Sequence, residues 1–155
     1  MKKNGLLLGV VTLIITFGLA ACSSSNSKSE TATYVMNQDE MNHEATFTHV
    51  GDKLTKVDQT MEYPLSYFGV EDELTDEMKE QINEQITSQY GEYDGGEGTS
   101  LKTTFTEDAL RIEMSLDLKK ADNAAISSLI VGSDSTNISF EQTVADFEAQ
   151  GYTKK

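Results

Sequence analysis

The chain has 155 residues and carries 26 acidic against 12 basic side chains, a formal net charge of −14 at pH 7. Binding of nucleic acids requires lysine and arginine side chains to neutralise phosphates, so this balance excludes a nucleic-acid partner. The length is that of one domain, and the chain holds one cysteine.

The N-terminus has the pattern of a secretory signal. Met1, Lys2, Lys3 and Asn4 form a short basic stretch, and residues 5–20 follow without a charge. This apolar run is short for a membrane span of about 20 residues, and small polar residues follow it where a stop-transfer segment would carry basic ones. A permanent transmembrane helix is therefore the weaker alternative.

The apolar run ends in Leu19, Ala20, Ala21 and Cys22, which resemble the bacterial lipobox at all four positions. Small side chains allow the signal peptidase to approach the backbone, and the thiol carries diacylglycerol through a thioether. The alternative is an ordinary signal peptide with an incidental cysteine. Acylation would use the one thiol of the chain, which removes a disulfide, a zinc site and a cysteine nucleophile from consideration.

These features predict three segments: a signal peptide over residues 1–21, an acylated Cys22 with a flexible tether over residues 22–30, and a single α+β domain over residues 31–155. Without the signal, 10 basic and 26 acidic side chains remain, a net charge of −16. Two or more acyl chains hold a protein stably on a membrane. We therefore expect a lipid-anchored protein on the extracytoplasmic side of a cell membrane.

Three strands are expected in the first third of the domain. Polar and apolar residues alternate over residues 31–36, 40–50 and 53–63, and Met41, Ala45 and Phe47 share one face. Turns are expected at residues 37–39 and 51–52. A slip in the alternation between Leu54 and Val57 predicts a bulge or a change of face.

An amphipathic helix is expected after Pro64. An apolar residue recurs at every fourth position from Leu74 to Tyr90, Thr75 is placed as the N-cap, and Gly91 ends the pattern. Because the apolar stripe is narrow, we expect the helix to lie on a sheet with its other faces in water.

Alternation returns after the glycine-rich residues 91–98, over residues 101–105 and 110–118, and predicts a hairpin that turns at residues 107–108. A short helix is expected over residues 122–130. A last helix begins at the capping box that opens with Ser139 and ends at Gly151. The order β-β-β-α-β-β-α-α predicts an α+β two-layer sandwich, with an antiparallel sheet of about five strands and the helices on one face.

Several of these landmarks occur together in one known family. The lipobox, the serine-rich tether, the "GDKL" turn, the helix that ends near Tyr-Gly, the alternating strand that ends in Lys and the "AQGY" helix end resemble the YehR-like lipoproteins. The resemblance implies a compact α+β domain in the bacterial envelope. It brings no catalytic or binding residues with it.

Two groups of residues are candidates for metal binding. Glu92, Asp94 and Glu97 lie on the glycine-rich segment, where their carboxylates could converge on Ca²⁺. No EF-hand pattern is present, and acidic runs are usually solvated faces. His43 and His49 stand about 20 Å apart along one strand, too far for a shared zinc ion. We expect them to be edge or surface histidines, and no cofactor is predicted.

An apolar lip is the remaining candidate site. Tyr63, Tyr67, Phe68 and Val70 crowd a predicted loop, where they could receive a peptide, a lipid or a protein partner. The alternative is that these side chains cover the open end of the core.

Taken together, the sequence favours a lipid-anchored, non-enzymatic binding or accessory module, with an envelope protein or a small ligand as its partner. An envelope sensor or buffer for a small molecule or Ca²⁺ is the second hypothesis. A weak hydrolase is the third, because the chain has no Gly-x-Ser-x-Gly elbow and only its many acids favour a glycosidase.

Overall fold

The computed structural model describes residues 28–155 except 39, 71–72, 123–125 and 127–136. The predicted signal peptide, Cys22 and most of the tether lie outside the described residues. So does nearly all of the helix expected over residues 122–130, of which Ile126 is described and buried.

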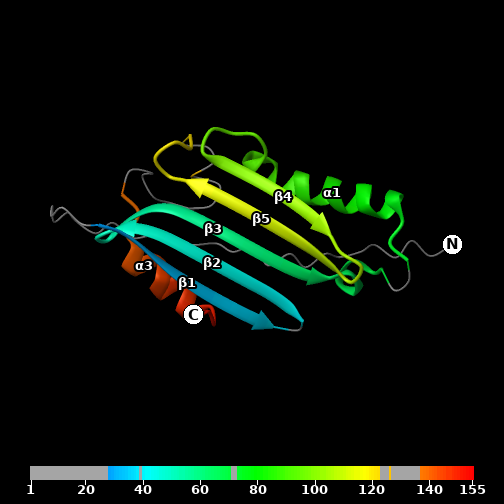
Figure 1. The fold of residues 1–155 in the computed structure, drawn as a ribbon, viewed down its shortest axis with the longest axis horizontal. Helices are drawn as coiled ribbons and strands as arrows, with labels where there is room; N and C mark the ends of the chain where they lie inside the picture. The colour runs from blue at the N-terminus through cyan, green and yellow to red at the C-terminus, as the bar shows by residue number, and fades with distance from the viewer. Residues whose placement is uncertain (1–27, 39, 71–72, 123–125, 127–136) are drawn as a thin grey trace.

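The core of the fold is one antiparallel sheet of six strands in the order β4-β5-β3-β2-β1-β6 (Figure 1). The strands are β1 Ser29–Gln38, β2 Met41–Val50, β3 Lys53–Pro64, β4 Thr99–Phe105, β5 Ala109–Asp117 and β6 Thr153–Lys154. Five of them were expected from alternation. The sixth, β6, has two residues and pairs with Tyr34 and Val35 of β1, and a strand so short leaves no periodic signal.

Two α-helices and two short 3₁₀ helices complete the described elements: α1 Asp76–Tyr90, α3 Phe140–Ala149, η1 Leu65–Phe68 and η2 Gly91–Tyr93. The side chain of Thr75 accepts a hydrogen bond from the backbone nitrogen of Met78, and that of Ser139 accepts one from Gln142. Both predicted N-caps are confirmed.

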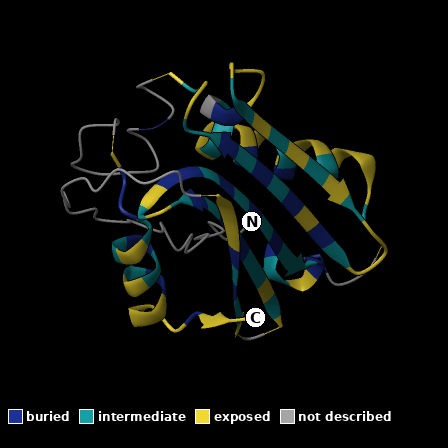
Figure 2. Ribbon diagram, turned by 60° about the vertical axis from the view of Figure 1, so that its left-hand side comes forward, coloured by how far each residue is buried: buried dark blue, intermediate teal, exposed yellow. Residues whose placement is uncertain are grey.

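The helices cover one face of the sheet, as predicted for the two-layer sandwich (Figure 2). On the side of α3, the ring of Phe147 packs edge-on against Phe47 of β2, with the centroids 4.9 Å apart. On the side of α1, the hydroxyl of Thr103 in β4 donates to Asn83 at 2.9 Å. Thr103 and Phe47 both belong to the inner face, because the register aligns them with buried Ile112 and Val57.

The largest differences from the predicted strand ends include both ends of β1. Strand β1 begins at Ser29, and Ser29 and Glu30, which were assigned to the tether, pair with Val50 and His49. Strand β1 also continues to Gln38, which pairs with Met41, so residues 37 and 38 of the expected first turn belong to the strand. Polar strand ends are held by backbone pairing, which the side-chain pattern does not record.

The predicted bulge in β3 is confirmed. The register with β2 shifts between Thr48 and His49, because Lys56 pairs with Thr48 while Leu54 pairs with His49. Thr55 is the extra residue, and its hydroxyl donates to the carbonyl oxygen of Thr48 at 3.0 Å. The bulge allows both Leu54 and Thr55 to be buried.

Candidate functional site

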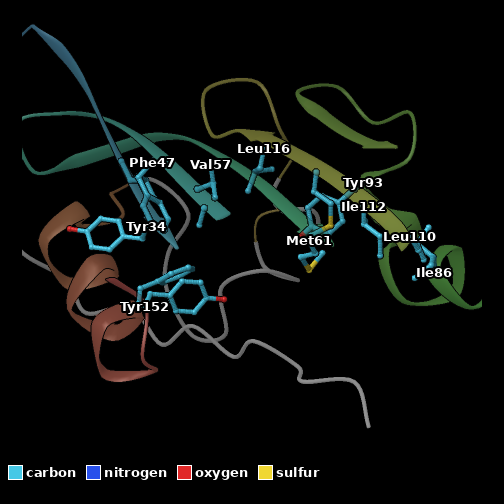
Figure 3. Packing of buried hydrophobic residues seen from close by; sticks show 14 of the residues in the cluster. Tyr34, Phe47, Val57, Met61, Ile86, Tyr93, Leu110, Ile112, Leu116 and Tyr152 are labelled. Atoms are coloured by element: carbon cyan, nitrogen blue, oxygen red, sulfur yellow. The ribbon is translucent and has the colours of Figure 1, made fainter. Parts of the chain in front are cut away.

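A group of polar and aromatic side chains lies on the inner face of the sheet between the two α-helices. It comes from four elements and the segment after α3, and we call it the inner-face cluster: His43 of β2, Gln59 and Tyr63 of β3, Tyr67 of η1, Tyr90 of α1, and Tyr152 after α3. Figure 3 shows Tyr152 beside α3 at one end of the core and Met61, Ile112 and Ile86 toward the other.

Strand alternation places the β-strand members of the cluster on this face. Gln59 faces inward between Val57 and Met61, which are both buried, and it pairs with the buried Ala45 of β2. His43 pairs with Met61, and Tyr63 pairs with the buried Leu110. These polar side chains therefore occupy positions that otherwise hold core residues.

His43 and Tyr152 are hydrogen-bonded to each other. The phenol oxygen of Tyr152 meets Nδ1 of His43, and the rings approach edge-on with their centroids 5.2 Å apart. Burial lowers the pKa of His43 to about 4, and the nearby Gln59 side chain opposes this shift only in part. The imidazole is therefore neutral at pH 7.

The tyrosines of the cluster lie close enough to influence one another. Burial raises the pKa of Tyr63 to about 12, with further contributions from Tyr90 and Tyr67. Burial also raises the pKa of Tyr90, with a contribution from Tyr67, and that of Tyr152, with a contribution from Tyr63. Tyr63, Tyr90 and Tyr152 therefore stay protonated at pH 7 and offer neutral hydroxyl groups.

Two nitrogen atoms of the cluster are unpartnered. The amide nitrogen of Gln59 and the ring nitrogen Nε2 of His43 are buried and have no hydrogen-bond partner among the described residues. The Gln59 side chain nevertheless acts on His43 as a hydrogen-bonding neighbour that raises its pKa, so the two side chains lie next to each other. Gln59 is only 6% exposed. An unpaired buried polar group costs about 1 to 3 kcal/mol, so such groups usually bind water or a ligand.

The predicted apolar lip divides into two pairs. Phe68 and Val70 are 8% and 6% exposed and belong to the core, so they do not form an open lip. They are buried because η1 turns the chain back over the end of the sheet, in line with the covering alternative. Tyr63 and Tyr67 are half-buried, with ring centroids 5.4 Å apart, and belong to the inner-face cluster.

Neither histidine is an edge or surface residue, so that expectation is wrong. Strand β2 lies between β1 and β3 in the sheet. His49 is 9% exposed, and its ring stacks on Phe140 with the centroids 3.7 Å apart. Its Nδ1 also lies 2.7 Å from the carbonyl oxygen of Gly51. Histidine occurs at both buried and exposed positions, so the polar-apolar alternation of the strand does not predict whether a histidine side chain is buried.

The acidic loop does not form a site in the part of the chain that the structure describes. Asp94 and Glu97 are exposed, and the side chain of Glu92 lies outside that part. Over the same residues, no group of three or more His, Cys, Asp or Glu side chains is arranged to hold a metal ion. None of the described helices has the length and apolar character needed to cross a membrane.

Sequence reasoning did not bring the cluster together. Gln59 had a signal, because it stands at an inward position of a regular alternation between Val57 and Met61. Tyr90 and Tyr152 were recognised only as residues at helix ends. Tyr90 and Tyr152 lie near the β3 residues only because α1 and α3 are placed on this face of the sheet.

The described elements define a two-layer α+β protein with one covered face and a polar cluster beneath the helices. The chain belongs to the family described as "Protein of unknown function (DUF1307)", whose profile matches residues 30–153. It is 28% identical over 156 residues to the "Uncharacterized lipoprotein Lmo0207" of Listeria monocytogenes, a match that covers 98% of this chain and 95% of that protein.

Two solved structures share the fold. The NMR structure of the E. coli YehR protein has a TM-score of 0.65 and 18% identity, and the match covers 84% of this chain and 93% of that one. The NMR structure of a Streptococcus pneumoniae TIGR4 protein has a TM-score of 0.57 and 17% identity, with 88% and 91% covered. The predicted resemblance to the YehR-like family and the α+β fold class are both confirmed.

Proposed function

We propose that this chain is a lipid-anchored protein of the bacterial envelope, attached through Cys22, whose domain binds a small molecule at the inner-face cluster. Two observations support the anchor. Leu19, Ala20, Ala21 and Cys22 match the lipobox, and a relative that is similar over nearly the whole chain carries the name lipoprotein.

The binding role rests on the unpartnered amide of Gln59. This side chain is almost fully buried, yet its nitrogen has no hydrogen-bond partner among the described residues. Around it stand a neutral histidine and several phenol groups within an otherwise apolar core. A few convergent polar groups in apolar surroundings are typical of small-molecule sites.

The same groups favour binding over hydrolysis. A general base works best when its pKa lies near the operating pH. The pKa of His43 is lowered to about 4, and Nδ1 is engaged by Tyr152. The six residues of the cluster also include no carboxylate, whereas a glycosidase needs a pair of them.

Native mass spectrometry can test the binding role. The full-length lipoprotein would be extracted from the membranes of its own cells in mild detergent, as wild type, Gln59→Met and Gln85→Met. Gln85 is an exposed residue of α1 and serves as the matched control. Methionine keeps the length of glutamine and removes its amide, so the fold should be retained.

We expect a non-covalent adduct of constant mass on the wild type and on Gln85→Met, and at least a tenfold lower occupancy on Gln59→Met. A wild-type protein without any adduct, or an adduct that survives unchanged in Gln59→Met, would contradict binding at the cluster.

A further inference from the structure

We infer that the inner-face cluster is built for an uncharged ligand that presents an amide group beside a small apolar group. This inference rests on the proposed binding function and adds the chemical class of the ligand. It is carried by three features of the cluster: its lack of charge, its unpaired nitrogen atoms and its apolar walls.

The absence of charge in the cluster argues against an ionic ligand. Its six members are a neutral histidine, a glutamine and four tyrosines, and none is a lysine, arginine, aspartate or glutamate that would offer a countercharge to a carboxylate, a phosphate or an amine. Burying an ion without a partner is costly. The net charge of −14 adds to the cost for an anion, and the unpaired N–H donors of Gln59 would face a cation unfavourably.

The unpaired nitrogens set the hydrogen-bonding pattern of the ligand. The Gln59 amide nitrogen has two N–H donors and therefore requires an acceptor oxygen. Nε2 of His43 depends on the tautomer. It donates if the Tyr152 hydroxyl donates to Nδ1, and it accepts if Nδ1 carries the proton. A secondary amide fits either case, because its oxygen accepts two hydrogen bonds and its N–H can donate one.

The walls of the cluster suit a small apolar group next to that amide. Met61 is 6% exposed and follows Gln59 on the same face of β3, and the Tyr63 hydroxyl lies 3.5 Å from its sulfur. The ring of Tyr63 in turn lies 5.4 Å from that of Tyr67, centroid to centroid. A thioether and aromatic rings gain contact energy from alkyl groups.

The probe for this ligand class is N-methylacetamide, which is an amide with a methyl group on each side. It would be added to the ¹⁵N-labelled, acylated full-length protein in detergent micelles. Sodium acetate and tetramethylammonium chloride at the same concentrations serve as the anionic and cationic comparisons. The readout is the side-chain NH₂ signal of Gln59, assigned by its loss in Gln59→Met, with the exposed Gln85 as an internal control.

We expect N-methylacetamide to shift the Gln59 signal saturably and to shift the Gln85 signal by at most one tenth of that amount. Acetate and tetramethylammonium should each shift both signals by no more than one tenth of the Gln59 shift that N-methylacetamide causes. A saturable response to either ion and none to the amide would overturn the ligand class and leave the binding function standing. Equal, non-saturable responses at both glutamines would mean that the cluster holds ordered water only. That result would overturn the ligand class. The proposed binding function would be overturned as well only if the native mass spectra also show no adduct.

Discussion

At the scale of single residues, His43 is a titratable group that burial holds in its neutral form. It is half-buried on the inner face, hydrogen-bonded to Tyr152, with Gln59 beside it and Tyr63 beyond. Both tyrosines titrate far above neutral pH, and glutamine does not titrate. Of these four side chains, only the His43 imidazole would therefore take up a proton when the pH falls below 7.

The lowered pKa of His43 predicts a loss of stability in mild acid. Its pKa is about 4 in the folded protein and about 6.5 in the unfolded chain, so the unfolded chain binds more protons as the pH falls below 6.5. This difference should lower the free energy of unfolding by about 2 kcal/mol between pH 7 and pH 5.

Comparison with His43→Gln isolates this contribution, because glutamine can still accept from Tyr152 and does not titrate. Protonation of the many carboxylates relieves repulsion in both proteins and cancels in the difference. Urea unfolding at the two pH values is the measurement. Parallel pH profiles for wild type and His43→Gln would show that His43 is not buried in its neutral form.

Two glycines with the same backbone angle provide a second test at this scale. Gly95 has φ 78° and open space where a Cβ atom would be, whereas Gly98 has φ 77° and a Cβ there would lie 2.6 Å from the backbone nitrogen of Ala121. The carbonyl oxygen of Gly98 also accepts a hydrogen bond from the backbone of Asp117. Gly98 therefore joins the start of β4 to the turn after β5.

Alanine at these two positions should separate backbone strain from steric overlap. Gly95→Ala should cost about 1 kcal/mol, which is the strain of a left-handed alanine. Gly98→Ala should cost about 3 kcal/mol, because overpacking is added to the same strain. Urea midpoints would measure both variants, and equal losses would mean that the approach of Gly98 to Ala121 is not a fixed contact.

At the scale of elements, the N-terminus of α3 is held by a residue far away in sequence. One oxygen of the Asp52 carboxylate accepts from the Ser139 hydroxyl at 3.0 Å and from the backbone nitrogen of Glu141 at 2.8 Å. The backbone nitrogen of Phe140 donates to the Asp52 carbonyl oxygen at 2.7 Å. The turn between β2 and β3 thus fixes where α3 begins on the sheet.

Removal of this carboxylate should loosen α3. Asp52→Ala should lower the free energy of unfolding by about 1 to 2 kcal/mol, through the lost cap and the lost negative charge at the helix N-terminus. The control is Glu84→Ala, an exposed acid in the middle of α1, which should change it by less than about 0.5 kcal/mol. If the two variants unfold at the same urea concentration, Asp52 does not stabilise α3.

The local part of this arrangement could be predicted from sequence and the distant part could not. Apolar spacing predicted α1 and α3, and Thr75 and Ser139 were recognised as their caps because an N-cap acts on residues only a few positions ahead. Asp52 accepts a hydrogen bond from Glu141, which is 89 residues away in the sequence. No periodic pattern in the sequence indicates a contact over that separation. The same reason explains why Tyr152 and His43 were not brought together.

At the scale of the whole molecule, the two faces of the sheet differ in kind. The inner face carries the core and the cluster beneath the helices. The outer face carries polar rows, in which the hydroxyls of Thr33 and Thr46 lie 3.0 Å apart and Asp58 accepts from Lys56 and Ser115. These polar groups have partners, whereas the unpartnered nitrogens of His43 and Gln59 lie on the inner face beneath the helices.

The proposed anchor would hold this domain close to the lipid surface. Strand β1 begins at Ser29, so residues 23–28 separate the sheet from Cys22. A flexible tether of six residues, as the sequence predicts, would span about 13 Å. A tether of this length between Cys22 and Ser29 would place the Ser29 end of the sheet next to the lipid head groups. Helix α1 begins at the opposite end of the sheet.

The anchor predicts a localisation phenotype that leaves the fold intact. Cys22→Ala should accumulate as an unprocessed precursor without acyl chains, because the thiol is the proposed acceptor of the lipid. Ser23→Ala, at the next position, is the matched control and should be acylated and processed like the wild type. Detergent partitioning and intact mass of the purified proteins would measure both steps.

The domain itself should not respond to either change, because Ser29 is the first residue of the sheet and Cys22 lies before it in the chain. Urea unfolding of Cys22→Ala should therefore give the wild-type midpoint and the same dependence on pH through His43. A Cys22→Ala protein that is still cleaved and still partitions into detergent like the wild type would overturn the anchor. The binding role of the cluster would then have to be assigned to a protein that is not lipid-anchored.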